Sequence, residues 1–307
     1  MRSRLAILLA AVASIGVGAV GVFALRHFHP PRPTALELRE RINNNAPFFG
    51  PVVVQMAAIK DFAVPFAGRG VPVRVYVPRV DEPLPVVVFV HGGGFIAGSI
   101  ASHEGLTTKL AQRADVIVVS VGYSLAPEAK WPAARDECLA VVQWMREHAA
   151  KEFGAKPGPI ALSGDSAGAA YCAQMLFIAR EQRLPLAGAV LFVPVVDMTA
   201  ATVTHAGTRQ MIEWFVADTF PADVLRTDPA ISPLFEPDFT GLAPVMLVLG
   251  DGDAWHTEQL AFAGKLASAR ADATTFVDKG VGHAVTDAGI DAAAAWLNAR
   301  LRTPAPE

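Results

Sequence analysis

The sequence contains few of the residues that build disulfide frameworks, metal sites or nucleic-acid interfaces. Its 307 residues include two cysteines, Cys138 and Cys172, which lie in helical patterns without CxxC spacing or a nearby pair of histidines. We therefore expect buried free thiols, with one disulfide as the alternative in an exported protein, and no metal site. Lysine and arginine number 26 against 29 aspartates and glutamates, which gives a net charge of −3. Because no cluster of positive charge occurs, we expect no binding to nucleic acid.

Charged residues are also missing from the run Leu5 to Leu25, which follows Arg2 and Arg4. A helix of this length, at about 1.5 Å per residue, would span the roughly 30 Å hydrocarbon core of a bilayer. The preceding arginines favour a cytoplasmic N-terminus, so the rest of the chain is expected on the non-cytoplasmic side of the membrane. The alternative is a signal peptide cleaved after Ala24, with Val22 two residues before it, and an exported protein.

Apolar residues make up 52% of the chain, enough for one large α/β domain or two smaller ones. The proline-rich stretch HPPRP, residues 29–33, is predicted to be a stiff linker. The chain is therefore divided into an N-terminal anchor or signal peptide with its linker, over residues 1–33, and a folded domain over residues 34–307.

Apolar segments rich in β-branched residues alternate with helical patterns through most of this domain. Strands are expected at Val71–Val77, Val86–Val90, Val116–Val121, Ile160–Ser163, Ala189–Val193, Val245–Leu249 and Thr274–Val277. Helical patterns cover residues 104–113, 132–150, 167–183, 256–270 and 285–301. This alternation predicts a mostly parallel sheet covered by helices on both faces, with sites at the carboxyl ends of its strands.

Two segments fall outside the alternation and are predicted to form a small helical cap. Residues 34–60 are expected to be helical, since Thr34 and Glu37 fit a capping box and Pro51 fits the start of a second helix through Ile59. Residues 199–228 carry three large aromatic side chains and no strand pattern, so we expect them to extend over the site.

A serine between two glycines follows the fourth expected strand, in the stretch LSGDSAGAAYCAQML. One interpretation is a plain strand-to-helix turn in which Ser166 caps the helix. The other is a nucleophile elbow, G-x-S-x-G, in which Gly164 and Gly168 let two backbones approach closely while a strained turn presents the serine hydroxyl. The surrounding pattern decides between them.

Three successive glycines follow the strand VVVFV, in the segment HGGGF. Acyl transfer explains them, because backbone N–H groups without side chains in the way can converge on a developing oxyanion. The candidate donors are Gly93, Gly94 and Ala167, the residue after the serine. His91 stands at the strand end, and we expect it to brace this loop rather than act as a base.

An activated serine needs a base and an orienting acid, which follow it in the chain order typical of α/β-hydrolases. Of the three later histidines, His205 lies in the cap segment and His256 at a helix start, whereas His283 lies in the glycine-flanked loop GVGHAV after the last strand. His283 is therefore the expected base. Asp251 and Asp253 both follow a buried strand, and the residue pattern alone leaves the choice of acid open.

Four motifs together resemble the hormone-sensitive-lipase-like family of α/β-hydrolases, which includes the bacterial family IV esterases. They are HGGGF, GYSLAPEAKWPAA over residues 122–134, GDSAG over residues 164–168 and RTDPAISPLF over residues 226–235. The resemblance runs from about Asp61 to the last helix. It implies that Asp253 is the acid, and that Gly92, Asp165 and Glu128 support the site.

The chain departs from the family pattern at three places. Asp253 is followed by Ala254 and Trp255 where the family usually has Pro-Leu. Ser124 stands where the family has an arginine, so a buried ion pair of the kind that this arginine could make is expected to be absent. Ala169 replaces a frequent glycine, which a helix tolerates well.

The resemblance implies a serine carboxylesterase that cleaves short- to medium-chain esters through an acyl-enzyme, without metal or organic cofactor. The expected partners are a small-molecule ester and, through Leu5 to Leu25, a membrane; a homodimer is compatible with the sequence. An amide deacetylase of the arylacetamide deacetylase type is the alternative enzyme. The alternative of another class is a non-catalytic binding protein, like the gibberellin receptor, which resembles this family but lacks the catalytic histidine.

Overall fold

The structure is a computed structural model that describes residues 32–44 and 54–301. The chain divides into two units, Met1–Thr34 and Ala35–Glu307. Of the first unit only residues 32–34 are described, so every element below belongs to the second. None of the helices in the described part is long and apolar enough to cross a membrane, and the predicted segment Leu5 to Leu25 lies outside that part.

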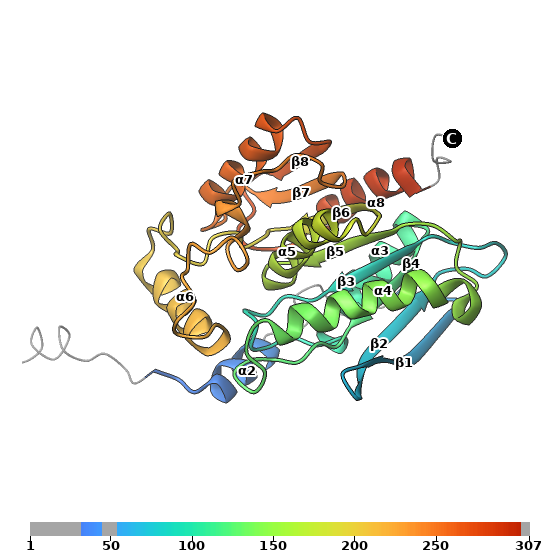
Figure 1. Ribbon diagram of the computed structural model, residues 1–307, viewed down its shortest axis with the longest axis horizontal. Coiled ribbons are helices and arrows are strands. Elements are labelled where there is room, and N and C mark those ends of the chain that lie inside the picture. The colour runs from blue at the N-terminus through green and yellow to red at the C-terminus, as the bar shows by residue number, and fades with distance from the viewer. Residues whose placement is uncertain (1–31, 45–53, 302–307) are drawn as a thin grey trace, which may run out of the picture. The chain divides into compact units, whose positions relative to one another are not determined.

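An eight-stranded sheet forms the centre of the described domain, in the order β1-β2-β4-β3-β5-β6-β7-β8 (Figure 1). The strands are β1 (Ala58–Phe66), β2 (Arg69–Val77), β3 (Val86–Val90), β4 (Ile117–Val121), β5 (Ile160–Asp165), β6 (Leu186–Phe192), β7 (Val245–Gly250) and β8 (Ala273–Asp278). β2 pairs antiparallel with both β1 and β4, whereas all the other neighbours pair in parallel. The predicted mostly parallel sheet is confirmed.

The central strands are apolar along their whole length because both of their faces are covered. Every residue of β3 (VVVFV) and of β4 (IVVSV) is buried. In the register of the sheet, Val88 lies between Val119 of β4 and Leu162 of β5. Continuous apolar runs of this kind are typical of parallel strands between two helical layers. The carboxyl ends of these strands therefore meet at one edge, where open α/β sheets hold their ligands.

Helices cover the two faces of the sheet and one end of the domain. They are α2 (Ala35–Asn44), α3 (Glu104–Ala114), α4 (Ala133–Phe153), α5 (Ala167–Gln182), α6 (Ala206–Thr219), α7 (His256–Ser268) and α8 (Asp287–Leu301), with short 3-10 turns at Ala101–His103 and Pro233–Phe235. One apolar core joins the sheet to α3 and α8, through residues such as Leu110 and Leu297. The other joins it to α4, α5 and α7, through residues such as Val141 and Phe262.

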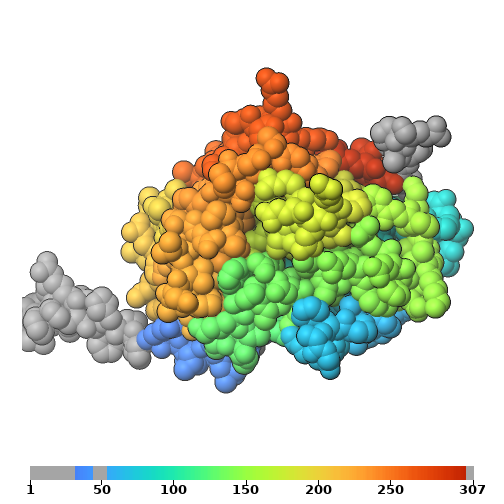
Figure 2. All heavy atoms as spheres, in the orientation of Figure 1, coloured from blue at the N-terminus to red at the C-terminus, as the bar shows by residue number. Residues whose placement is uncertain are grey.

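The two predicted cap segments meet at one end of the domain, where the blue surface of α2 and the yellow-to-orange surface around α6 adjoin (Figure 2). Leu38 and Ile42 of α2 share a small apolar cluster with Trp214 and Phe215 of α6. α6 lies inside the segment 199–228, which was predicted to extend over the site.

The seven predicted strands all occur, and α2 matches the first part of the helical segment predicted over residues 34–60, but the end of that segment is not helical. The predicted helix start at Pro51 lies outside the described residues. Ile59 lies in β1, which no pattern predicted, and not at the end of a helix. β1 is an edge strand that pairs with β2 along its whole length, with Ile59 beside Tyr76. Backbone pairing across the hairpin therefore outweighs the helical pattern there. Cys138 and Cys172 are both free and buried, as predicted.

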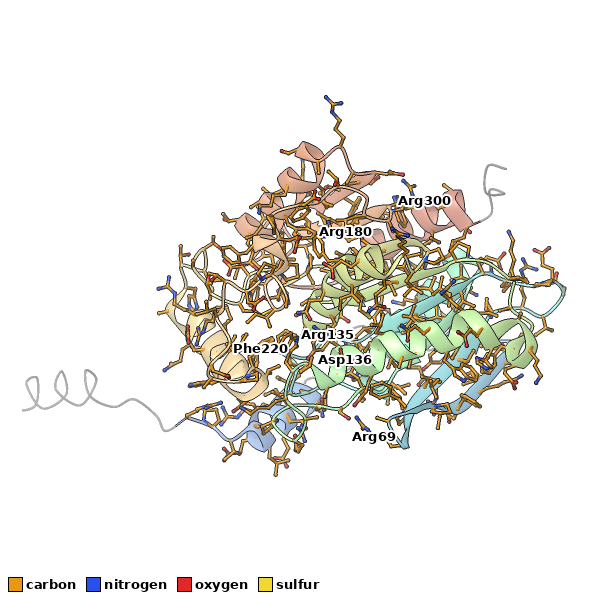
Figure 3. All side chains as sticks on the ribbon, in the orientation of Figure 1. Arg69, Arg135, Asp136, Arg180, Phe220 and Arg300 are labelled. Carbon is orange, nitrogen blue, oxygen red and sulfur yellow. The ribbon has the colours of Figure 1, made fainter. Side chains whose placement is uncertain are left out.

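Ser124 lacks the charge of the family's arginine, as expected, but an arginine from elsewhere in the chain, itself half exposed, forms an ion pair beside it. Glu137 of α4 is fully buried, and it forms an ion pair with Arg69, the first residue of β2. Figure 3 shows the Arg69 side chain at the β1–β2 hairpin, beside the start of α4. Arg69 also donates to the Ser124 hydroxyl over 2.9 Å, while the Ser124 backbone N–H donates to Glu137 over 2.7 Å. A guanidinium from another part of the chain thus neutralises the buried carboxylate.

Candidate active site

Ser166 occupies a sharp turn between β5 and α5. Its backbone has φ 51° and ψ −116°, an unusual conformation for a residue with a side chain. The close approach around it explains the flanking glycines, since a Cβ on Gly168 would lie 2.0 Å from the carbonyl oxygen of Val90. A Cβ on Gly164 would lie 2.7 Å from the same oxygen. Together these features give the strained strand-to-helix geometry of a nucleophile elbow.

The three glycines of the loop after β3 leave little room for side chains. A Cβ on Gly93 would lie 2.3 Å from the carbonyl oxygen of Ala97, and one on Gly94 would lie 2.7 Å from the Phe215 ring. Gly93 also has a φ of 123°, which side chains rarely allow. Gly93, Gly94 and Ala167 all line the same cavity as Ser166.

Asp165 joins this loop to the elbow. Its Oδ1 accepts a hydrogen bond from the backbone N–H of Gly92 over 2.9 Å, and its carboxylate also contacts Nε2 of His103 at 3.3 Å. Burial opposes the ionisation of Asp165, but His103 and the Gly92 N–H outweigh it and leave its pKa lowered. The carboxylate therefore holds the loop and the serine turn at a fixed separation.

His91 and Glu128 contact other parts of the same loop system. The ring of His91 stacks on Tyr123 at 4.2 Å between centroids, and the Tyr123 hydroxyl donates to the His91 carbonyl over 2.8 Å. Burial lowers the pKa of His91 to about 3, with His103 adding to the effect, so the ring is neutral. Glu128 pairs with Arg39 of α2 at 2.7 Å, and Arg39 also donates to the carbonyl of Ile96 beyond the loop.

The structure brings Ser166, His283 and Asp253 together in one hydrogen-bonded series. Nε2 of His283 lies 2.8 Å from Oγ of Ser166, and Nδ1 lies 2.9 Å from Oδ2 of Asp253. An ionised carboxylate can only accept hydrogen bonds, so the Nδ1 nitrogen carries the proton in the neutral ring. The lone pair of Nε2 is then free to accept the serine proton, which is the arrangement that general-base activation of a hydroxyl requires.

Asp253, and not Asp251, faces His283. Asp253 is buried, and its Oδ1 accepts from the backbone N–H of Trp255 over 3.1 Å. Burial disfavours its charge, but hydrogen bonds from His283, Gln259 and Trp255 outweigh the burial and lower the pKa. Asp251 is exposed and instead accepts from the backbone N–H of Gly280 over 2.6 Å, so it closes the turn after β8.

A cavity of about 260 Å³ opens beside Ser166 and is almost entirely apolar. Its polar lining consists of Ser166, His283, His103 and Asp165. The remaining wall comes from the glycine loop, from Ile42 of α2 and from Met211, Ile212, Phe215 and Val216 of α6, together with Phe95, Ala167, Val193, Val195, Met198, Trp255, Ala284 and Val285.

Trp255 and Gln259 are site residues that the sequence analysis did not single out. The Trp255 ring lies 4.4 Å from the His283 ring between centroids and lines the cavity. Gln259 donates to Asp253. The one available signal in the sequence was spacing: Trp255 lies two residues after Asp253, and Gln259 lies one helical turn after Trp255.

The other candidate histidines have roles at helix ends. His205 caps α6 by accepting from the backbone N–H of Thr208 over 3.2 Å, and His256 is the first residue of α7. Over residues 32–44 and 54–301, no group of three or more histidine, cysteine, aspartate or glutamate side chains is placed to hold a metal ion.

A serine, a histidine and an aspartate joined in this way, at the carboxyl edge of a sheet covered on both faces, define an α/β-hydrolase. The family described as alpha/beta hydrolase fold matches residues 87–287. The chain belongs to the hormone-sensitive-lipase-like family of α/β-hydrolases.

Named relatives of this family are similar over most of the domain. The chain is 34% identical over 224 residues to the carboxylic ester hydrolase LipN of Mycobacterium tuberculosis, a match that covers 69% of this chain and 60% of that protein. It is 34% identical over 231 residues to the ethyl acetate hydrolase of Pseudomonas putida, covering 70% of this chain and 71% of that protein. The thermostable carboxylesterase EstE1 from a metagenomic library matches with a TM-score of 0.80 and 29% identity, over 88% of this chain and 99% of that chain.

Glu258 and Asp197 are two further buried carboxyl groups, and Glu258 follows Asp253 by five residues along the chain. Glu258 accepts from the backbone N–H of Val196 over 3.3 Å and contacts the hydroxyl of Thr202 at 3.4 Å. Burial and then the charge of Asp197 raise the pKa of Glu258 to about 9. Glu258 is therefore protonated at neutral pH.

We expect the free energy of unfolding to fall less with rising pH in Glu258→Gln than in the parent. The folded protein binds this proton more tightly than the unfolded chain between the ordinary value of 4.5 and about 9, so the free energy of unfolding falls as pH rises through that window. An amide has no proton to lose, so the decline should be shallower in the variant. Urea unfolding at pH 5, 7 and 9 measures it, with the exposed Glu147→Gln as a control that should follow the parent; equal slopes for Glu258→Gln and the parent would contradict the expectation.

Proposed function

We propose that the protein is a serine carboxylesterase that hydrolyses short- to medium-chain carboxylic esters through an acyl-enzyme. The observation that carries the proposal is the hydrogen-bonded series from Ser166 through His283 to Asp253 at the wall of an apolar cavity. In this proposal Ser166 is the nucleophile, His283 the general base and Asp253 the orienting acid. The relatives named for ester hydrolysis support an ester as the substrate rather than an amide.

In the first half-reaction, Oγ of Ser166 attacks the ester carbonyl while Nε2 of His283 takes the hydroxyl proton. The carbonyl oxygen becomes an oxyanion, which the backbone N–H groups of Gly93, Gly94 and Ala167 are proposed to hold. Asp253 stabilises the imidazolium and keeps its ring oriented. The bond to the alcohol then breaks, the alcohol leaves with the proton from Nε2, and the acyl group remains on Ser166.

In the second half-reaction, water replaces the alcohol. His283 takes a proton from the water as its oxygen attacks the acyl-enzyme, and the same N–H groups hold the second oxyanion. The bond to Oγ breaks, the proton returns to Ser166, and the carboxylic acid departs. His283 therefore mediates each proton transfer, between Ser166 and the alcohol in the first half-reaction and between water and Ser166 in the second.

The cavity wall supports uncharged, apolar acyl and alcohol groups as the substrate class. Its aliphatic and aromatic side chains offer no partner for a charged substituent, and an unpaired charge in such a site is costly. The volume of about 260 Å³ suits groups of a few carbon atoms better than long fatty chains. The presence of a base next to Ser166 favours an enzyme over a binding protein on the same fold.

We also propose that Leu5 to Leu25 anchors the chain in a membrane, with the hydrolase domain on the non-cytoplasmic side. Its support is the sequence: an uncharged run of bilayer length after two arginines, joined to the domain by a proline-rich linker. Export after signal cleavage is the competing outcome.

Ser166→Ala should abolish ester hydrolysis. We expect kcat for p-nitrophenyl butyrate to fall by about 10³-fold or more, because only binding and the oxyanion donors would remain. A fluorophosphonate probe should label the parent at Ser166 and leave the variant unlabelled, while the exposed Ser268→Ala keeps parental activity. Activity of Ser166→Ala within tenfold of the parent would refute the proposal.

Substitutions of the two aspartates that follow β7, Asp251 and Asp253, should differ sharply in their effect on kcat. We expect Asp253→Asn to lower kcat by about 10³- to 10⁴-fold, because an amide favours the wrong tautomer of His283. Asp251→Asn should stay within about threefold of the parent, because the Asp251 carboxylate bonds the backbone N–H of Gly280 in the turn after β8, whereas His283 bonds Asp253. Steady-state kinetics on the two purified variants compares them, and the opposite ranking would assign the acid to Asp251.

The full-length protein should sediment with membranes and resist carbonate extraction, whereas a chain starting at Pro33 should stay soluble with the same kcat/KM. The reason is that a run of this length and polarity is more stable in lipid than in water. Fractionation followed by mass spectrometry of the mature N-terminus makes the measurement. A soluble exported protein that starts at Leu25 would show instead a cleaved signal peptide.

A further inference from the structure

The first turn of α7 lies directly behind Asp253 and presents a buried amide to it. Gln259 is fully buried, and its Nε2 donates to Oδ2 of Asp253 over 2.9 Å and to the carbonyl oxygen of Pro194 over 3.3 Å. Oδ2 is the same oxygen that accepts from Nδ1 of His283. One carboxylate oxygen therefore receives two donors, one from the base and one from Gln259.

The rest of the Gln259 amide is poorly satisfied. Its Oε1 is buried and has no hydrogen-bond partner among the described residues. A buried polar atom without a partner is destabilising, and methionine, with a similar length, would fill the space without that cost. The favourable contribution of the amide therefore lies in the two bonds that Nε2 makes.

The loop between β7 and α7, residues 251–255, carries Asp253, and its carboxylate depends on such side-chain and backbone donors for its orientation. Ala254 follows Asp253, whereas a proline at that place would restrict the backbone of the acid. The Trp255 N–H fixes Oδ1 and the Gln259 amide fixes Oδ2, so both carboxylate oxygens are held. Nε2 of Gln259 also donates to the carbonyl oxygen of Pro194, which lies just after β6. Gln259 therefore connects the Asp253 carboxylate to the end of a second strand.

We propose that Gln259 is a positioning residue of the esterase, which sets the orientation of the Asp253 carboxylate and through it the ring of His283. The inference rests on the proposed function of the Ser166 site. Gln259 touches neither the substrate nor the reacting atoms in this proposal. Its effect reaches the reaction through the direction and the charge of Asp253, which must stay ionised to hold the Nδ1 proton.

The first test compares two buried glutamines in the full-length protein. Gln259→Met should lower kcat by about 10- to 100-fold, the size expected for losing a hydrogen bond to a charged group, while KM stays within about threefold. The matched control is Gln174→Met, since Gln174 is also buried, donates to Ile231 over 3.2 Å and does not line the cavity. It should lose a similar amount of thermal stability and keep kcat within about twofold of the parent.

The second test makes the donor itself depend on pH. In Gln259→Glu, a protonated carboxyl can donate to Asp253, whereas an ionised one cannot and repels it. The ratio of variant to parent kcat/KM should therefore be highest near pH 6 and fall by at least tenfold by pH 9. Both proteins share the other titratable groups around this turn, so the ratio leaves only the titration of the new carboxyl group and its effect on these neighbours: Asp253, His283, Asp197, His256 and Glu258.

The outcomes separate the positioning role from the proposed function. A parent that neither reacts with a fluorophosphonate at Ser166 nor hydrolyses p-nitrophenyl butyrate would overturn the proposed function itself. An active parent with Gln259→Met within threefold of it in kcat, or with a Gln259→Glu ratio that does not change with pH, would overturn the positioning role alone. If Gln259→Met fails to fold, the pH dependence of Gln259→Glu decides the question.

Discussion

The site depends on one close contact between two backbones, where the start of α5 crosses the end of β3. Gly168 approaches the carbonyl oxygen of Val90 so closely that a Cβ would lie 2.0 Å from it. This approach sets the serine turn and the glycine loop side by side, and Asp165 then fixes their separation through the N–H of Gly92. A wider crossing would move Ser166 away from the proposed oxyanion donors. The unusual backbone of Ser166 is the conformational cost of that arrangement.

Buried charge around the site is controlled by pairing or by protonation. Glu137 is neutralised by Arg69, Asp253 is held ionised by three donors, and Glu258 takes up a proton. His91 is kept uncharged by burial. An unbalanced charge in such a buried region would be felt strongly, because the effective dielectric constant is low there. In the proposed reaction, the negative charge of the oxyanion therefore develops next to backbone N–H donors whose positions are already fixed.

The sequence predicted the central sheet and the serine turn well because both are local patterns. Continuous apolar strands and the glycine spacing of GDSAG each depend on near neighbours along the chain. β1 was missed because its stability comes from pairing with β2, and the ion pair of Glu137 because its partner Arg69 lies far away in sequence. The choice of Asp253 came from family resemblance, since both aspartates follow the same strand. The contacts of Gln259 depend on how α7 packs, which no spacing rule specifies.

The strand order also determines when the site can form during synthesis. From β3 through β5, β6, β7 and β8, each later strand is added to a free edge of the sheet, so the growing chain never has to open pairs already made. Ser166 and the glycine loop can thus be in place early. His283, however, lies beyond β8 and 117 residues after Ser166, so at about 5–20 residues per second the ribosome adds the base roughly 6 to 23 s after the serine. A nascent chain that does not yet include the loop after β8 would carry the serine and no base, which delays hydrolysis by the proposed mechanism until that loop has been made.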